Sequence, residues 1–503
     1  MLLKTILLRP FTERYPGVMT AKPKHVFDRE QEWAGLAAFA SNAHPGAMLG
    51  VVSGRRRQGK SFLLEALTAS TDGLYFPAVE ATEAVSLRSF TNLLVRQGIP
   101  VSRPVQDWGD AIALLLSSQT GQPRAVVIDE FPFLVKASPS LPSIIQRELG
   151  PGGSGQRSSV RLLLCGSAMS VMGQLLAGHA PLRGRASLEL LVQPFGYRDA
   201  ARFWDAEDPE LAALLHAVVG GTPAYRREFV AFDAPEDRAD FDPWVLRTVL
   251  NRQSPLFREA RYLLAEETEI RDPGLYHSVL GAIASGNHTN GAIANYVGRK
   301  SADITHPLNV LEDAALIARE VDLFRAGRWL YQVTEPLITF YEVVMRPEWF
   351  RLESGYANEV WHDQRPDFLS RVMGPHFESL CRSFVPLTGR GVFGGPVGDV
   401  GSGVVNDSAN RTQMQIDVAV LAPPEPGERR RILSLGEAKW GEIMTPRHAA
   451  RLARARDLLA TSFDVSDCAL ACYSAAGFSG DLRSAAGPRL KLISLADIYQ
   501  TGT

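Results

Sequence analysis

Short apolar runs recur through the first two hundred residues of the chain, and polar or glycine-rich turns separate them. The runs Ala47–Val52, Ala125–Ile128 and Val160–Cys165 have the length and the largely apolar character, broken by Arg161 in the third run, of strands that are buried on both faces. Helical spacing of apolar residues follows the first run, from Phe62 to Leu67. Strands that alternate with helices predict an α/β fold built on a parallel sheet.

The turn after the first run has two glycines, a lysine and a serine at the spacing of a P-loop. A strand, a glycine turn and a helix N-terminus surround a polyphosphate with backbone N–H groups and the positive end of a helix dipole. We expect Lys60 to reach the β- and γ-phosphates of ATP and Ser61 to hold Mg²⁺. The predicted nucleotide-binding residues are Gly54, Arg55, Arg56, Arg57, Gln58, Gly59, Lys60, Ser61 and Phe62.

Two carboxylates follow the second apolar run, where a parallel strand would emerge at the ligand edge of the sheet. Asp129 is predicted to accept from the Mg²⁺ shell, and Glu130 to polarise the water that attacks ATP. Ser167 ends the third run and is either a sensor of the γ-phosphate or a turn serine.

Three arginines outside the loop have two interpretations each. Arg29 opens a helical pattern and either packs on the nucleotide base or belongs to a helix start with favourable dipole chemistry. Arg183 and Arg185 lie in a glycine turn, where one of them, with Arg185 preferred, is an arginine finger in the same chain or across a subunit interface. The alternative is a solvated loop.

The middle of the chain has a helical pattern followed by a hairpin pattern. Helices are predicted at 276–283, 290–296 and 301–316, and strands at 317–321 and 329–333. This order is typical of a winged helix, whose third helix can enter the major groove of DNA. Only Arg299 and Lys300 add positive charge at the start of that helix, so a packing module is an equal alternative. An amphipathic connector helix is predicted at 335–349, and a polar domain boundary at 361–367.

The C-terminal part carries a second set of polar residues. Glu437 and Lys439 are two apart on a predicted strand and therefore share a face. The strand containing Asp417 could pair as a hairpin with the strand of Glu437 and Lys439. In that case Asp417 and Glu437 hold Mg²⁺ or Mn²⁺, while Lys439 orients a water. Glu378 on the preceding helix then completes the acidic cluster. This set resembles the core of the PD-(D/E)XK nucleases, although an exposed ion pair is the simpler interpretation of Glu437 and Lys439 alone.

These motifs together resemble the archaeal-type ATPases, which are related to the AAA+ and STAND NTPases. The resemblance rests on Phe27–Glu30, the P-loop, Val127–Glu130, Gly166–Ser167, Leu182–Arg185 and Gly220–Pro223. It implies an AAA+-like P-loop NTPase core, a helical lid, a winged helix and a C-terminal domain like a restriction endonuclease. The expected domains are 1–205 for the ATPase core, 206–265 for the lid, 266–350 for the winged helix and connector, and 368–503 for the nuclease-like domain.

Composition narrows the possible functions. The 503 residues carry a net charge of -2, so DNA contact requires a local basic patch rather than a global field. The four cysteines show no zinc-site spacing, and Lys4 interrupts the apolar start, so we expect a cytoplasmic protein without a membrane span. Two functions remain open: an ATP-driven enzyme that acts on DNA, or a STAND-type ATP switch whose C-terminal domain binds nucleic acid or protein without cutting. Either could form a homo-oligomer.

Overall fold

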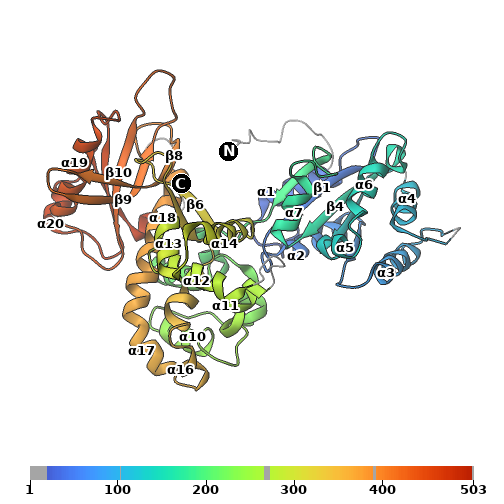
Figure 1. The fold of residues 1–503 in the computed structure, drawn as a ribbon, viewed down its shortest axis with the longest axis horizontal. Coiled ribbons are helices and arrows are strands. Elements are labelled where there is room, and N and C mark those ends of the chain that lie inside the picture. Colours follow the sequence, from blue (N-terminus) through green and yellow to red (C-terminus); the bar gives the residue numbers. More distant parts are fainter. Residues whose placement is uncertain (1–19, 102–103, 120, 266–271, 389–391, 501–503) are drawn as a thin grey trace. The chain divides into compact units, whose positions relative to one another are not determined.

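The computed structural model describes residues 20–101, 104–119, 121–265, 272–388 and 392–500. The chain divides into two compact units, Met1–Gln193 and Pro194–Thr503 (Figure 1). The four cysteines are buried free thiols. Across the described ranges, no helix has both the length and the apolar character that crossing a bilayer requires.

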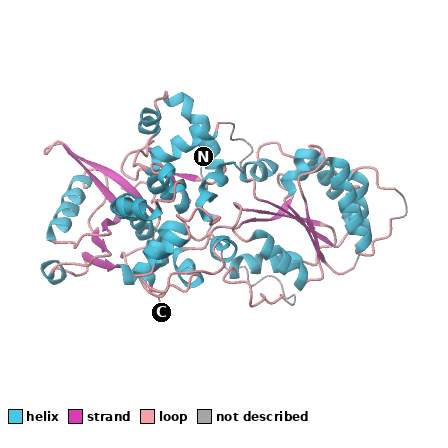
Figure 2. Ribbon diagram, turned by 90° about the horizontal axis from the view of Figure 1, so that it is seen from below, coloured by secondary structure: helices cyan, strands magenta, loops and turns pink. Residues whose placement is uncertain are grey.

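The first unit contains a parallel sheet with helices on either side of it (Figure 2). Its five strands lie in the order β2-β3-β4-β1-β5. The expected strands at 47–52, 125–128 and 160–165 are confirmed to within one residue at each end. The strands are β1 (Met48–Ser53), β2 (Leu74–Pro77), β3 (Arg124–Asp129), β4 (Val160–Gly166) and β5 (Ala186–Leu191). This topology, with a P-loop directly after β1, is that of a P-loop NTPase.

Helices cover both faces of this sheet, as the largely apolar character of its strands requires. Alternate residues of one strand enter different cores: Val51 packs on one face and Val52 on the other. The first core includes residues of α3 (Glu83–Arg96), α4 (Trp108–Ser118), α5 (Phe131–Ala137), α6 (Leu141–Leu149) and α7 (Met169–Leu176). The second includes residues of α1 (Glu30–Ala40) and α2 (Lys60–Ser70).

The second unit begins with helices in the range expected for the lid. They are α8 (Tyr197–Phe203), α9 (Pro209–Val219), a π-helix (Tyr225–Phe229), α10 (Phe241–Arg247) and α11 (Leu256–Ala265). Three helices and a hairpin follow in the expected order: α12 (Pro273–Ala284), α13 (Asn290–Val297), α14 (Ser301–Asp313), β6 (Ile317–Val321) and β7 (Trp329–Val333). Helix α14 ends before the expected residue 316, and Ala315 just beyond it has a positive φ of 54°.

The segment 361–367 is helical and not an irregular linker, and the domain boundary there stays a prediction. It belongs to α17 (Ala357–Asp367), which continues through a π-helix (Phe368–Met373) into α18 (Gly374–Phe384). Trp361 and Phe368 are buried, their ring centroids are 5.3 Å apart, and Phe368 stacks on Phe241 of α10 at 6.0 Å. These aromatic contacts hold the polar segment in the helix despite Pro366. The predicted connector at 335–349 is divided into α15 (Pro336–Phe340), a π-helix (Tyr341–Met345) and the start of α16 (Trp349–Glu353).

A second sheet of five strands, in the order β12-β11-β10-β9-β8, forms the C-terminal part. The predicted hairpin is confirmed, because β9 and β10 pair antiparallel. The elements are β8 (Asp399–Asp407), β9 (Thr412–Leu421), β10 (Ile432–Lys439), α19 (Pro446–Leu459), β11 (Ala469–Ser474), α20 (Gly480–Ser484), β12 (Leu490–Ser494) and α21 (Leu495–Tyr499). Helix α19 packs against β8, β10 and β11, whereas α18 packs against β9 and β10.

The turn between β6 and β7 lies on the edge strand β8. Leu323 N donates to Ser402 O at 3.1 Å, and Val404 N donates to Asp322 Oδ1 at 3.3 Å. Gly403 permits this approach, because a Cβ atom there would lie 2.4 Å from the Phe324 ring. The hairpin and the C-terminal sheet are therefore in direct contact.

Candidate functional sites

The P-loop connects the end of β1 to the start of α2, as predicted. Gly54 has a φ of 149°, and a Cβ atom at this position would lie 2.4 Å from Val192 O. Gly59 precedes the helix with a φ of 84°. Both positions require glycine, the first for close backbone approach and the second for its left-handed conformation. This turn leaves the α2 N-terminus facing the loop, where a polyphosphate fits.

Lys60 is the first residue of α2, and its side chain is buried. Its Nζ atom donates to Arg55 O at 2.8 Å, across the loop. Burial lowers the pKa of Lys60, and the nearby Cys165, Glu130 and Asp129 oppose that shift. A buried ammonium group inside the loop is suited to a phosphate ligand, which would compensate its desolvation.

Asp129 ends β3 and is held by several donors. Burial raises its pKa, but hydrogen bonds from Cys165, Ser61 and Tyr75 outweigh burial, so the pKa is lowered overall. Tyr75 Oη donates to Asp129 Oδ2 at 2.5 Å. The carboxylate is therefore ionised and adjacent to Ser61, the pair predicted to hold Mg²⁺. The sequence analysis missed Tyr75, whose hydroxyl in the otherwise apolar strand β2 was the available signal.

Glu130 and Ser167 contact each other and the P-loop. Ser167 Oγ lies 3.0 Å from both carboxylate oxygens of Glu130. Arg56 Nε donates to the same hydroxyl oxygen at 3.3 Å. Glu130 has a positive φ of 50°, a conformation that is uncommon for a non-glycine residue and recurs at functional sites. The structure thus brings the predicted base, the predicted sensor and a P-loop arginine together.

Arg29 lies beside the P-loop and is held there by polar contacts of its guanidinium group. Its Nη2 donates to Gln58 O at 3.2 Å, and its Nη1 lies 2.8 Å from Glu32 Oε1. The guanidinium is buried and fixes the position of the loop. Stacking of Arg29 on a base stays a prediction.

Arg183 and Arg185 are exposed at the start of β5. Because β5 is parallel to β1 and Ala186 pairs with Leu49, Arg185 lies at the opposite edge of the sheet from the P-loop. The separation along the strands is about 16 Å, which exceeds the reach of an arginine side chain. The register therefore argues against the in-chain form of the arginine finger, and the form across a subunit interface stays a prediction.

The C-terminal constellation lies on the β9–β10 hairpin and α18. Asp417 Oδ2 accepts from Ala438 N at 3.0 Å, and Gln415 Nε2 donates to Oδ1 at 3.2 Å. Glu437 Oε1 lies 3.1 Å from Lys439 Nζ and 2.8 Å from Arg451 Nη1. Glu437 is 3% exposed, and its Oε2 has no hydrogen-bond partner among the described residues. One buried carboxylate oxygen is therefore available to a ligand.

The charges of this second site are strongly coupled. Burial, followed by the negative charge of Asp417, raises the pKa of Glu378 to about 8. Burial also raises the pKa of Asp417. Burial lowers the pKa of Lys439, but Asp417 and Glu437 outweigh it and raise the pKa overall. Three carboxylates thus influence one another, as a cation site requires.

These carboxylates do not form a ready metal cage. In the part of the chain that the structure describes, no group of three or more His, Cys, Asp or Glu side chains is arranged to hold a metal ion. Glu437 instead contacts two basic side chains, Lys439 and Arg451. The oxygen donors suit a hard divalent cation, but binding would require these basic groups to move away from Glu437.

Two arginines of α19, Arg451 and Arg454, contact the protein itself. Arg451 also donates to Gln415 O at 3.1 Å. Arg454 donates to both oxygens of Asp407, at 2.9 and 3.1 Å. Nothing in the chain near these arginines indicates that Glu437 and Asp407 lie opposite this helix.

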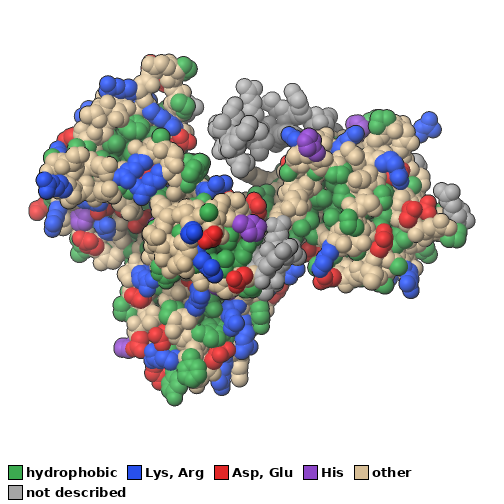
Figure 3. Space-filling model, in the orientation of Figure 1, with side chains coloured by type: hydrophobic (Ala, Val, Ile, Leu, Met, Phe, Trp, Pro, Cys, Tyr) green, Lys and Arg blue, Asp and Glu red, His purple; other side chains and the backbone are tan. Residues whose placement is uncertain are grey.

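Helix α14 presents a polar face with little positive charge. Ile304, Leu308 and Leu311 are buried, as predicted, while His306 and Asn309 are exposed. Figure 3 shows basic and acidic side chains interspersed over the visible face. The charge pattern therefore gives DNA binding by this helix no support, and such binding stays a prediction.

Comparison with known proteins gives distant similarities. No protein family profile matches the chain. An uncharacterized protein of Methanocaldococcus jannaschii is 26% identical over 339 residues, which are 67% of this chain and 72% of the relative. Similar solved structures include a Walker-type ATPase of Pyrococcus abyssi, with 17% identity, 65% of this chain and 99% of the other covered, and a TM-score of 0.46.

Two other solved structures show weaker similarity. The ORC2 protein of Aeropyrum pernix is 13% identical, with 63% of this chain and 94% of the other covered and a TM-score of 0.40. The RuvB Holliday junction branch migration motor of Thermotoga maritima is 16% identical, with 62% and 95% covered and a TM-score of 0.32. The chain resembles each of these proteins in part. Its assignment to the P-loop NTPase fold rests on the strand order of the chain itself.

Proposed function

We propose that the chain is a cytoplasmic ATP hydrolase of the archaeal-type, AAA+-related kind. The observation that carries this proposal is the link from Arg56 through Ser167 to Glu130, since it connects the predicted phosphate loop to the predicted base. Lys60 and the backbone of the loop bind the phosphates, while Ser61 and Asp129 hold Mg²⁺. When bound, Mg²⁺ neutralises charge that develops on the phosphate oxygens.

The residues of this site have separate roles in hydrolysis. Glu130 accepts a proton from the attacking water at one carboxylate oxygen. Ser167 and Arg56 restrain that carboxylate until ATP binds, when the arginine turns to the phosphates. Arg185 of a second copy supplies the finger, so the active form is a homo-oligomer.

We further propose that the C-terminal domain is a metal-dependent nuclease-like domain that acts on DNA. The unpartnered Oε2 of buried Glu437 favours this proposal, because a divalent cation would satisfy it. Asp417, Glu437 and Glu378 would hold Mg²⁺ or Mn²⁺, which lowers the pKa of a bound water. Lys439 positions that water, and the winged helix engages DNA or transmits the ATP state.

In the regulatory alternative, the protein hydrolyses ATP but does not cleave DNA. In that case ATP controls assembly, and the second domain binds nucleic acid or protein without cutting. The contacts of Lys439 and Arg451 with Glu437 favour this alternative, because they neutralise the carboxylate without a metal.

One experiment separates these functions. Linear, single-stranded and supercoiled DNA are incubated with the protein, with Mg²⁺ or Mn²⁺ and with or without ATP, beside the double variant Asp417→Ala, Glu437→Ala. Cleavage that the double variant lacks supports the nuclease and shows whether ATP gates it. ATP hydrolysis without cleavage under any condition supports the switch, and absence of ATP hydrolysis refutes the first proposal.

A further inference from the structure

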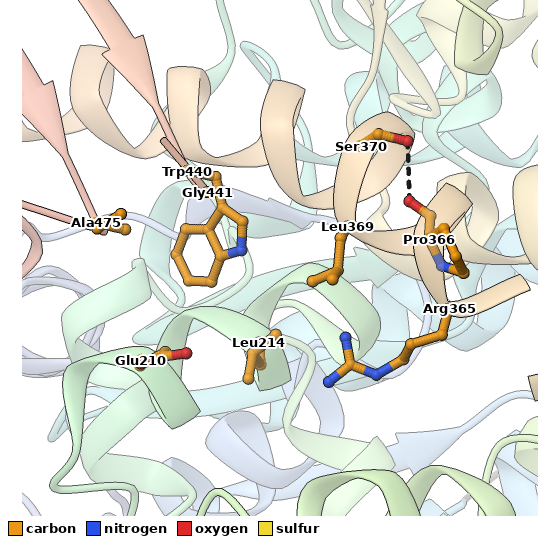
Figure 4. A pocket seen from close by; sticks show the side chains of 10 residues that line it. Glu210, Leu214, Arg365, Pro366, Leu369, Ser370, Trp440, Gly441 and Ala475 are labelled. Atoms are coloured by element: carbon orange, nitrogen blue, oxygen red, sulfur yellow. Dashed lines mark hydrogen bonds between the residues drawn. The ribbon is translucent and has the colours of Figure 1, made fainter. Parts of the chain in front are cut away.

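A cavity of about 570 Å³ lies in the second unit, between α9, α17 and the ends of β10 and β11 (Figure 4). Leu214 and Leu369 form apolar parts of its wall, and Trp440 lies opposite them. The cavity is lined by residues of α9, of α17 with the π-helix that follows it, and of the C-terminal sheet. These three segments are far apart in the sequence. It serves no step of the ATPase or of the proposed nuclease.

The position of the cavity relates it to the second site. Trp440 directly follows Lys439, and Ala475 N donates to Lys439 O at 3.1 Å. Since Trp440 and Ala475 both line the cavity, it begins one residue beyond the predicted water-positioning lysine. Neighbouring Cα atoms are about 3.8 Å apart, so the backbone at Lys439 is adjacent to the cavity wall.

The aromatic wall has a fixed orientation. The Trp440 ring packs edge-to-face on Phe377 of α18, with centroids 5.7 Å apart. Figure 4 shows the indole projecting into the same space as Leu214 and Leu369. A flat ring held between an indole and aliphatic side chains gains stacking contact that does not depend on base identity.

The charged residues of the wall are already paired. Glu210 accepts from Arg238 at 2.5 Å, and Arg365 Nε donates to both oxygens of Asp242, at 2.9 and 3.1 Å. A ligand therefore needs no net charge inside the cavity, but it meets polar groups at the rim. A nucleobase has this combination of apolar faces and polar edges, with its phosphate outside the cavity.

We propose that this cavity receives an unpaired base of a DNA strand whose backbone lies at Lys439. This inference rests on the proposed nuclease-like function and narrows its substrate to single-stranded, tailed or frayed DNA. A fully paired base cannot enter, because its edge is occupied by the complementary strand and its faces by neighbouring bases.

Binding tests the proposal without requiring cleavage. Fluorescence anisotropy with the full chain in EDTA compares a labelled single strand, a blunt duplex of the same sequence and a duplex with an unpaired tail. We expect tighter binding of the two probes with unpaired bases. Trp440→Ala should weaken their binding roughly tenfold and change duplex binding little, whereas Trp440→Phe should retain most of it.

Two further variants control for folding and for aromatic loss. Ala476 is exposed at the cavity wall, so Ala476→Trp fills the space without removing a contact and should reproduce the effect of Trp440→Ala. Phe350 is 82% exposed on α16, and Phe350→Ala should have no effect. Free deoxynucleoside monophosphate should compete only weakly, because the strand backbone contributes to binding.

The outcomes separate this inference from the function on which it rests. A preference for unpaired bases that depends on Trp440, in a protein that never cleaves, supports the cavity and refutes the nuclease. Cleavage with a preference that neither Trp440→Ala nor Ala476→Trp changes overturns the cavity. Failure to bind any of the DNA probes, or full competition by the free nucleotide, also overturns it.

Discussion

The P-loop site and the C-terminal site both contain buried carboxylates, but their surroundings hold these groups in opposite states. Hydrogen bonds from Cys165, Ser61 and Tyr75 lower the pKa of Asp129, although burial acts against them. In the second site burial dominates and raises the pKa of both Asp417 and Glu378. The first site thus holds an ionised ligand, whereas in the second site a cation would have to compete with the proton on Glu378.

The largest expected effect comes from removing the cation of the first site. Lys60→Ala should reduce ATP turnover at least about a hundredfold, because it removes the buried ammonium group that is proposed to bind the phosphates. Steady-state phosphate release at saturating and limiting ATP is the measurement. Lys136→Ala is the matched control, since this lysine is exposed and pairs with Glu80. Normal turnover in Lys60→Ala would refute the nucleotide site.

The next change tests whether the second site needs its unpartnered oxygen. Glu437→Gln should abolish metal-dependent cleavage and weaken Mn²⁺ binding at least about tenfold, while ATP turnover stays unchanged. Isothermal titration with Mn²⁺ and a DNA cleavage assay measure the two effects. Glu442→Gln is the control, because Glu442 is exposed in the loop after β10. Unaltered Mn²⁺ binding by Glu437→Gln contradicts the assignment.

A pH titration sharpens the contrast between the two sites. The pKa of Glu378 is raised to about 8 in the folded protein, from an ordinary value of 4.5. The folded state therefore binds this proton more tightly, and metal-free stability falls as the pH rises from about 4.5 to about 8. Glu378→Gln should remove this part of the pH dependence of stability. At pH 8 the melting temperature of the variant should therefore exceed that of the wild type by roughly 2–5 °C.

Cation binding should depend on pH for the same reason. Mn²⁺ displaces the Glu378 proton below pH 8, so its affinity should increase about tenfold per pH unit between pH 6 and 8. An affinity that is constant over this range would show that Glu378 is not a ligand. Glu359→Gln, on the exposed face of α17, serves as the control for the loss of a carboxylate.

The smallest expected effect is at Tyr75, which helps to keep Asp129 ionised. Tyr75→Phe removes one hydrogen bond, so the pKa of Asp129 should rise and the acid limb of the ATPase pH profile should move to higher pH. The stability loss should be about 1 kcal/mol. A profile identical to that of the wild type would mean that the tyrosine has no influence on the metal ligand.

The sequence was sufficient for features whose residues are local in the chain. The P-loop, the strand before Asp129 and the β9–β10 hairpin follow from apolar runs and motif spacing, and each lies within a residue or two of its predicted position. The helix through 361–367 could not be predicted in this way, because Phe241 and Phe340 hold its aromatic residues from distant parts of the chain.

Pairings between distant segments explain the other differences. Tyr75 reaches Asp129 from a neighbouring strand, and Arg451 reaches Glu437 from a helix on the face of the sheet. Neither contact has a sequence signature, since each depends on the register of elements that pack together. The role of Arg185 was left open by the sequence, and the parallel pairing of β5 with β1 argues only against a finger within the same chain.

The contact between the β6–β7 turn and β8 also affects self-association. Strand β8 is the edge of its sheet, and an exposed edge offers unpaired N–H and C=O groups to strands of other molecules. The turn satisfies two of these groups, at Ser402 and Val404, and covers the glycines at 401 and 403 with apolar side chains. A protein that lost this contact would expose a glycine-rich strand edge, and we expect it to aggregate before its sheet unfolds.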